Sequence, residues 1–260
     1  YEIASCLVGS EMCIRDSDWY AKALSDNKQI LQRITNVLVA DSAFSKKPFI
    51  DNMLGIGFNV VSRLRHDAAL YYLWEGDPTG KPGRPRVKGE KIDFKNIDKS
   101  KVAILDTDES NGQVYALKAW CKSLHRKISL VIHILPKGGH RLYFSTDESM
   151  SGRDVMEYYC TRFQIEFCFR DAKQFVGLTD SQARDTRKLD FAFNSSFTAV
   201  NVAKIMCSEY NLSIGRLKAL IINAYYAQRI IDVFENNPNT QLNHEIVNEI
   251  FGFAADAAVS

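Results

Sequence analysis

The spacing of apolar residues along the first part of the chain predicts alternating helices and strands. Residues 18–34 place apolar side chains at mixed three- and four-residue steps, which is typical of a helix. Residues 36–40 and 58–64 are short, β-branched apolar runs and predict two buried strands. A helical pattern over residues 46–54 lies between them. Strand, helix and strand in this order predict two parallel strands in a sheet covered by helices.

The middle of the chain has a different pattern. Short runs rich in β-branched and aromatic residues follow one another, separated by the turn-forming pairs Asn111-Gly112 and Gly138-Gly139. The strands expected from these runs are residues 102–105, 114–120, 127–135 and 141–145. We therefore expect residues 66–145 to form an antiparallel β module.

Helical patterns return after the β module. They cover residues 153–173, about 188–210 and about 214–234, and a short helix and tail are expected over 236–260. Residues 18–65 and 146–235 are accordingly assigned to one α/β core, and residues 66–145 to an insertion in it.

The helix predicted over residues 153–173 carries an unusual row of charges. On a helical wheel Tyr159, Arg162, Glu166, Arg170 and Lys173 fall within roughly an 80° arc bordered by apolar residues. The face expected to be in solvent lies opposite and includes Asp171. Because buried charges need partners, two interpretations are open: a row that binds a metal and an anion, or an internal ladder of salt bridges.

Composition and charge narrow the class of protein only a little. The chain has 260 residues, of which 46% are hydrophobic, and a formal net charge of +2, as in ordinary soluble domains. No apolar run reaches the ~18 residues of a membrane span. Nucleotide-binding and hydrolase motifs are absent, and the histidines lack metal-ligand spacing. Cys121, Cys160, Cys168 and Cys207 are expected to be reduced thiols in the cytoplasm.

The first residues require separate treatment. The run from Cys6 to Ser17, Cys-Leu-Val-Gly-Ser-Glu-Met-Cys-Ile-Arg-Asp-Ser, resembles translated sequencing-adapter read-through. Residues 1–17 are therefore expected to be foreign to the natural protein and to have no part in its fold.

The charged row matches a known signature. Tyr159-x-x-Arg162-x-x-x-Glu166-x(6)-Lys173 resembles the Y-x-x-R-x-x-x-E-x(6)-K signature of DDE transposases of the insertion-sequence-four type. The resemblance implies an RNase H-like mixed sheet flanked by helices, with a β-rich insertion. It also implies that Glu166 is the third catalytic carboxylate, and that Tyr159, Arg162 and Lys173 hold transposon-end DNA. Arg170, on the same row, is a further candidate for DNA contact.

Asp41 is the second candidate for catalysis. It directly follows the first buried strand, where α/β sheets place their sites, although an aspartate there can equally be the N-cap of the next helix. The run Val39-Ala40-Asp41-x-x-Phe44-Ser45-Lys46-Lys47 is similar to the family block that carries the second catalytic aspartate. Arg63 and Arg65 would then lie near DNA, or be solvated charges at a strand end.

A basic loop offers another possible DNA contact. Its sequence Pro82-Gly83-Arg84-Pro85-Arg86 is similar to an AT-hook, which lays arginines in the minor groove. An ordinary surface loop is the alternative interpretation, since the motif is short and rich in Gly and Pro.

The resemblance also implies a mechanism and its partners. Asp41 and Glu166 would bind two Mg²⁺ or Mn²⁺ ions for strand cleavage and transfer. The partners would be transposon terminal repeats and target DNA, with a possible homodimer on paired ends in the bacterial cytoplasm.

The first catalytic aspartate is not found where the family places it. Only Asp16, Asp18 and Asp26 precede Asp41, and they lie in the adapter-like run or on a helical pattern. We therefore expect an N-terminal truncation that has lost the opening strands, and an inactive fragment. A non-catalytic DNA-binding relative, decayed or domesticated, is the alternative; an RNase H-like nuclease with other substrates is a third possibility.

Overall fold

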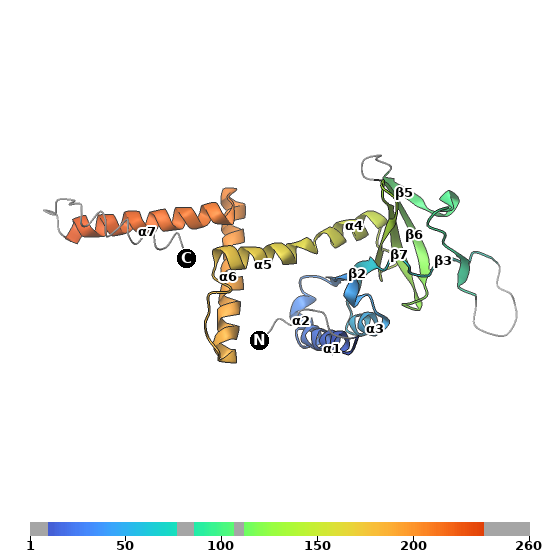
Figure 1. Ribbon diagram of the computed structural model, residues 1–260, viewed down its shortest axis with the longest axis horizontal. Helices are drawn as coiled ribbons and strands as arrows, with labels where there is room; N and C mark the ends of the chain where they lie inside the picture. Colours follow the sequence, from blue (N-terminus) through green and yellow to red (C-terminus); the bar gives the residue numbers. More distant parts are fainter. Residues whose placement is uncertain (1–9, 77–85, 107–111, 237–260) are drawn as a thin grey trace. The chain divides into compact units, whose positions relative to one another are not determined.

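The computed structural model describes residues 10–76, 86–106 and 112–236, with side chains from Asp18 onward except those of Asp106, Val233 and Asn236. The chain divides into two compact units, residues 1–163 and residues 164–260, which are described separately. The first contains all of the described strands (Figure 1).

The first unit is built on one mixed sheet of eight strands. Their order is β1-β2-β8-β7-β6-β3-β4, and β5 pairs with β6 beside this path. The β1–β2 pair is parallel and all other pairs are antiparallel. The strands are β1 (Val37–Val39), β2 (Asn59–Leu64), β3 (Leu70–Leu73), β4 (Lys88–Lys91), β5 (Ala103–Asp106), β6 (Gln113–Cys121), β7 (Arg126–Ile134) and β8 (His140–Ser145).

The predicted strand–helix–strand unit is confirmed. Val37 pairs with Asn59 and Val39 with Val61 in parallel register, and α3 (Lys47–Gly55) connects the two strands. The four strands predicted over residues 102–145 are also present, and the turn between β7 and β8 has Gly138 and Gly139 at φ 89° and 85°. Such left-handed backbone favours glycine because it has no Cβ.

Helices cover both faces of the sheet (Figure 1). On one face, α1 (Ser10–Asp26), α2 (Lys28–Leu31) and α3 contribute to a core in which Ile50, Met53 and Phe144 are fully buried. On the other face, α4 (Gly152–Cys160) packs through Val155 on Val61 and Val131. Gly152 makes this contact close: a Cβ there would lie 2.4 Å from the Cβ of Ala116.

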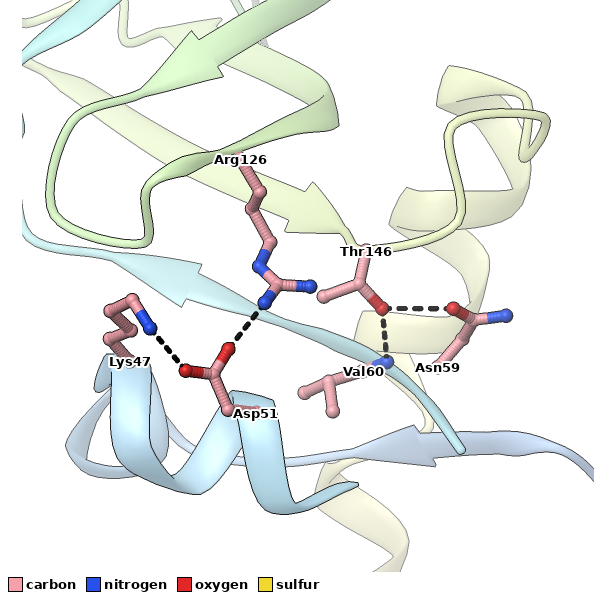
Figure 2. A network of polar contacts seen from close by, with 6 residues as sticks. All are labelled: Lys47, Asp51, Asn59, Val60, Arg126 and Thr146. Atoms are coloured by element: carbon pink, nitrogen blue, oxygen red, sulfur yellow. Dashed lines mark hydrogen bonds and ion pairs between the residues drawn. The ribbon is translucent and has the colours of Figure 1, made fainter. Parts of the chain in front are cut away.

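Polar contacts fasten neighbouring elements of the first unit (Figure 2). Asp51 of α3 accepts hydrogen bonds from Lys47 and from Arg126 at the start of β7. Thr146 accepts a hydrogen bond from the Val60 amide at 2.8 Å and donates one to the side chain of Asn59 at 3.0 Å. These contacts tie α3 to the β6–β7 turn and the end of β8 to β2.

The second unit is helical. Its helices are α5 (Phe163–Phe175), which begins at the unit boundary, α6 (Thr186–Tyr210) and α7 (Ile214–Asn236). Ala172, Leu178 and Val200 form its buried core. The Asp185 side chain caps α6 by accepting hydrogen bonds from the amides of Arg187 and Lys188.

The strands of residues 66–145 do not form a sheet of their own, because β8 pairs with β2 and β7 pairs with β8. The mixed sheet flanked by helices is confirmed. The RNase H-like assignment, and the division of the chain at residues 65, 145 and 235, stay predictions.

Candidate nucleic-acid and catalytic site

Asp41 stands at the carboxyl end of β1, as the sequence predicts. Its Oδ1 accepts a hydrogen bond from the Ser42 amide at 2.6 Å and so caps a short 3₁₀ helix, Ser42–Phe44. The capping interpretation is therefore correct. It does not exclude a ligand, because the side chain is exposed and a carboxylate has acceptor sites on both oxygens.

Two serines fix the backbone around Asp41. The hydroxyl of Ser62, a fully buried residue on β2, donates to the Asp41 carbonyl oxygen at 3.1 Å. Ser45 lies 2.8 Å from the Ser62 hydroxyl and donates to the Arg63 carbonyl at 2.9 Å. The segment that presents Asp41 is thus held on β2.

Arg63 and Tyr143 are direct neighbours across the sheet. They are paired positions of β2 and β8, and Arg63 is exposed while Tyr143 is buried. Val61 and Tyr143 belong to the core under α4, so Arg63, two residues after Val61, points to the same face. Arg63 therefore lies on the α4 side of the sheet, beside the end of β1.

Tyr159 of α4 completes this group. Its ring packs on that of Tyr143, with centroids 4.8 Å apart. Burial raises the pKa of the Tyr159 hydroxyl above its usual value; Arg162 and Arg63 oppose this rise, and the negative charge of Asp41 adds to it. The hydroxyl therefore stays protonated at neutral pH and can donate a hydrogen bond.

The helix predicted over residues 153–173 is interrupted, which corrects the expectation of one continuous helix. α4 ends at Cys160, α5 begins at Phe163, and the Arg162 amide bonds the Tyr159 carbonyl at 3.1 Å in a tight turn. The Arg162 guanidinium lies 6.0 Å from the centroid of the Tyr159 ring and 4.7 Å from that of Phe163. Local periodicity did not reveal this break because no Gly or Pro marks it.

The predicted solvent face of this helix is also wrong in its second half. Asp171 is buried, at 7% exposure, whereas Phe167 and Phe169 are 41% and 44% exposed. The physical reason is that α5 packs through Ala172 and Cys168 on Val200 and Leu178, which turns Asp171 inward. Arg170 compensates the buried carboxylate with an ion pair at 3.0 Å.

The remaining residues of the signature lie on α5. Glu166 is in its first turn and Lys173 in its last turn, and both are exposed. Arg170 packs its guanidinium 4.9 Å from the Phe167 centroid in addition to pairing with Asp171. The signature is therefore divided: Tyr159 and Arg162 belong to the first unit, and Glu166 and Lys173 to the second.

The other arginines expected to bind DNA have separate positions. Arg65 forms a two-pronged ion pair with Asp67, at 3.0 Å and 3.1 Å, at the end of β2. Arg86 stacks on Trp74, with its guanidinium 3.8 Å from the ring centroid. Arg84 and most of the AT-hook-like sequence lie outside the described residues. Of the predicted arginines, the structure groups Arg63 and Arg162 with Asp41 and Tyr159.

The carboxylate oxygens of Asp41 are suitable ligands for Mg²⁺ or Mn²⁺. In the first unit, however, the other charges that act on Tyr159 together with Asp41 are two arginines and no further acid. Across the described residues there is no group of three or more acidic, His or Cys side chains that could hold a metal. Taken alone, the group in the first unit fits a phosphate better than a cation, because two guanidinium groups and only one carboxylate act on the Tyr159 phenol.

Sequence reasoning did not assign a role to Tyr143, Ser45 or Ser62. Tyr143 is buried and belongs to the core under α4. Ser45 stands in the block that surrounds Asp41, which is the one signal in the sequence that could have drawn attention to it.

None of the described helices is long and apolar enough to cross a membrane. A search of curated proteins finds no match. Residues 21–202 match the family described as Transposase DDE domain, a range that includes Asp41, Tyr159, Glu166 and Lys173. Proteins of this family act on DNA and generally use divalent metal ions. Because the match covers most of the sequence, the chain belongs to the transposase DDE domain family.

Proposed function

We propose that this chain is part of the catalytic core of a transposase of the insertion-sequence-four type, which cleaves transposon ends and transfers the strands. The observation that carries the proposal is the group around Tyr159: the charges of Arg162, Asp41 and Arg63 all influence the pKa of its hydroxyl. Two guanidinium groups and a carboxylate that act on the same phenol suit a phosphodiester that must be held while one of its bonds is broken.

The residues have distinct roles in this proposal. Arg63 and Arg162 neutralise the charge of the phosphate, and the Tyr159 hydroxyl donates a hydrogen bond to a phosphate oxygen. Asp41 and Glu166 are the two carboxylates that would hold a divalent ion, and Lys173 would bind the neighbouring phosphate. A bound Mg²⁺ or Mn²⁺ would supply activation of the attacking oxygen and stabilisation of the leaving one.

Cation binding tests the pairing of Asp41 with Glu166. Binding of Mn²⁺ to the whole chain can be followed by the loss of the free-ion electron paramagnetic resonance signal. We expect Asp41→Asn and Glu166→Gln each to abolish the tighter binding. The control Asp18→Asn, an exposed aspartate on α1, should leave it unchanged. Unchanged binding in either site variant would contradict shared coordination.

Cleavage tests the catalytic part separately. Only two of the proposed catalytic carboxylates, Asp41 and Glu166, are assigned in this chain, so we expect it to nick supercoiled plasmid DNA in Mg²⁺ or Mn²⁺ poorly or not at all. Efficient nicking that is lost in Asp41→Asn would refute the inactive state and support the catalytic role. DNA binding without nicking or cation binding would favour the alternative, a non-catalytic DNA-binding protein.

A further inference from the structure

An apolar stripe runs along α7 in the second unit. Its members recur at alternating steps of three and four residues: Leu217, Leu220, Ala224, Ala227, Ile231 and Phe234. Of these six, only Leu217 is buried; Leu220 and Ile231 are 48% and 47% exposed, and both alanines are exposed as well. An apolar stripe repeated over several helical turns is typical of a helix that packs against a second helix.

A groove adjoins this stripe. It has a volume of about 680 Å³ and lies between α6 and the first half of α7, with Leu217 as a member of both the groove and the stripe. The side of the groove formed by α6 is apolar too, since Phe191 and Val202 line it and are 75% and 51% exposed. The stripe and the groove are together called the α6–α7 surface below.

The sequence that follows α7 has the pattern of a partner helix. Residues 237–260 lie outside the described residues. On a helical wheel, one half of the circumference of residues 242–257 carries Leu242, Ile246, Val247, Ile250, Phe251, Phe253, Ala254 and Ala257, with Asn243 as a polar exception. The other half carries His244, Glu245, Asn248, Glu249 and Asp256. A helix with this pattern buries one side and exposes its charges on the other.

The connection to this segment suits a return along α7. The helix ends at Asn236 and is followed by Asn237-Pro238-Asn239-Thr240. Proline disfavours continuation of the helix, and a connection of four residues is usual between antiparallel helices. A helix over residues 241–257 would be about 25 Å long, and the distance along α7 from Leu220 to Asn236 is about 24 Å. The segment can therefore reach back to the groove.

The two apolar stripes are complementary in size when they are aligned about the middle of this connection. The pairs expected are Ile246 with Ile231, Ile250 with Ala227, Phe253 with Ala224 and Ala257 with Leu220. Three of these four pairs join a large side chain to an alanine, which lets two facing helices interdigitate.

The charges of the two helices are complementary as well. Residues 241–257 contain Glu245, Glu249 and Asp256 and no lysine or arginine. Between Ile214 and Ile231, in contrast, α7 has three cations and no acid: Arg216, Lys218 and Arg229. Opposite charges on neighbouring helices favour their pairing over the pairing of two like-charged copies.

We propose that residues 241–257 form a helix that folds back antiparallel on α7 and covers the α6–α7 surface of the same chain. A second copy of the chain is the competing occupant. The short connection favours the chain's own segment, because it gives an effective concentration on the order of millimolar. The proposal involves neither DNA nor a metal and stands independently of the proposed function.

Crosslinking in the whole chain tests the proposed register. Ala227→Cys combined with Ile250→Cys should form a disulfide within one chain on mild oxidation, because these side chains would face each other. Mass spectrometry identifies the linked peptides, and electrophoresis without reductant shows whether the bridge lies within one chain. The matched control is Ala227→Cys with Asn248→Cys, since Asn248 lies on the charged side of the segment and should crosslink far less.

Each outcome of the crosslinking experiment decides the proposal. A bridge within one chain that the control lacks would support it. A bridge between two chains would assign the surface to a second copy and overturn it. No bridge, or equal bridging in the control pair, would overturn it as well.

Hydrogen exchange gives a second readout without added cysteines. Phe253→Asp would place a charge against the apolar stripe, so the amides of α7 between Ala224 and Ile231 should exchange roughly tenfold faster or more as the segment undocks. Binding of a hydrophobic dye should also increase, because the α6–α7 surface becomes accessible. The control Asn248→Asp adds the same charge on the solvent side and should change neither. Unchanged exchange in Phe253→Asp, or an equal effect of the control, would contradict the proposal.

Discussion

The Tyr159 ring lies against the Tyr143 ring with centroids 4.8 Å apart, which joins the last turns of α4 to β8. Through this contact a helix residue and a strand residue share one wall of the candidate site. The hydroxyl of Tyr159 is the group that both Asp41 and the two arginines affect. The pKa of Tyr159 is therefore the quantity that reports most directly on the charges of Asp41, Arg63 and Arg162.

Tyr159→Phe should change the pH dependence of stability. Burial raises the pKa of Tyr159 in the folded protein, so its contribution to stability is complete below the unfolded-state pKa of about 10 and is lost as pH rises through the folded-state value. The Phe variant cannot ionise. Urea unfolding at about pH 8 and about pH 11 should show the wild type losing stability relative to this variant. An unchanged difference would contradict the raised pKa.

Ser62→Ala should loosen the segment that presents Asp41. The substitution removes a buried hydroxyl that donates to the Asp41 carbonyl and contacts Ser45, so we expect a loss of about 1–2 kcal/mol in the free energy of unfolding. Urea denaturation measures the loss. The control is Ser25→Ala, an exposed serine on α1, which should stay within about 0.5 kcal/mol of the wild type.

Gly152→Ala should push α4 away from the sheet and lower the free energy of unfolding. The new Cβ would lie 2.4 Å from the Ala116 Cβ and 2.8 Å from Leu105 Cδ1, and relieving such overlap costs about 1–3 kcal/mol. Thermal unfolding should show the loss, and the fluorescence of the tyrosines on α4 and β8 should change.

The matched control for this change is Gly55→Ala in α3. A Cβ at Gly55 meets no atom within 4 Å, so the variant should be neutral, or more stable by up to about 1 kcal/mol. Equal destabilisation by the two alanines would show that close packing of Gly152 is not the cause.

Asp51→Asn should reduce stability at neutral pH and lose its effect in acid. The hydrogen bond from Lys47, assisted by Arg126, holds the pKa of Asp51 below its usual value. The stabilisation is thus present above the unfolded-state pKa of about 3.9 and lost as pH falls through the lower folded-state value. Both partners are partly exposed, so we expect about 1 kcal/mol at pH 7 from urea denaturation. A difference that persists at about pH 2 would contradict this explanation.

Much of the fold could be predicted because its signals are local. The β-branched runs at β1 and β2, and the paired glycines before β8, act through the backbone of a few residues. β3 and β4 were not predicted: Leu70–Leu73 is short and does not alternate, and Lys88–Lys91 has no apolar residue. Their pairing is decided by β6, which is distant in sequence.

Some residues of the candidate site could likewise be predicted from local sequence signals, and others could not. Asp41 was predicted from its place after a strand and from the similarity of its block, and Tyr159 and Arg162 from the spacing of the signature. The contact of Arg63 with Tyr143 could not be predicted, because it depends on the register between β2 and β8. The burial of Asp171 was mispredicted because α6, rather than the periodicity of α5, decides which side of that helix is covered.

The pairing of β2 with β8 also has a kinetic consequence. β1, α3 and β2 are consecutive, so the Ser62 bond to Asp41 closes a short loop. The Arg63–Tyr143 pair must close a far longer one, which carries a greater entropic cost and forms slowly. During refolding, Asp41 should form its bond to Ser62 before β8 brings Tyr143 into place. A nascent chain released early would then expose Asp41 without Tyr143 and Tyr159 beside it.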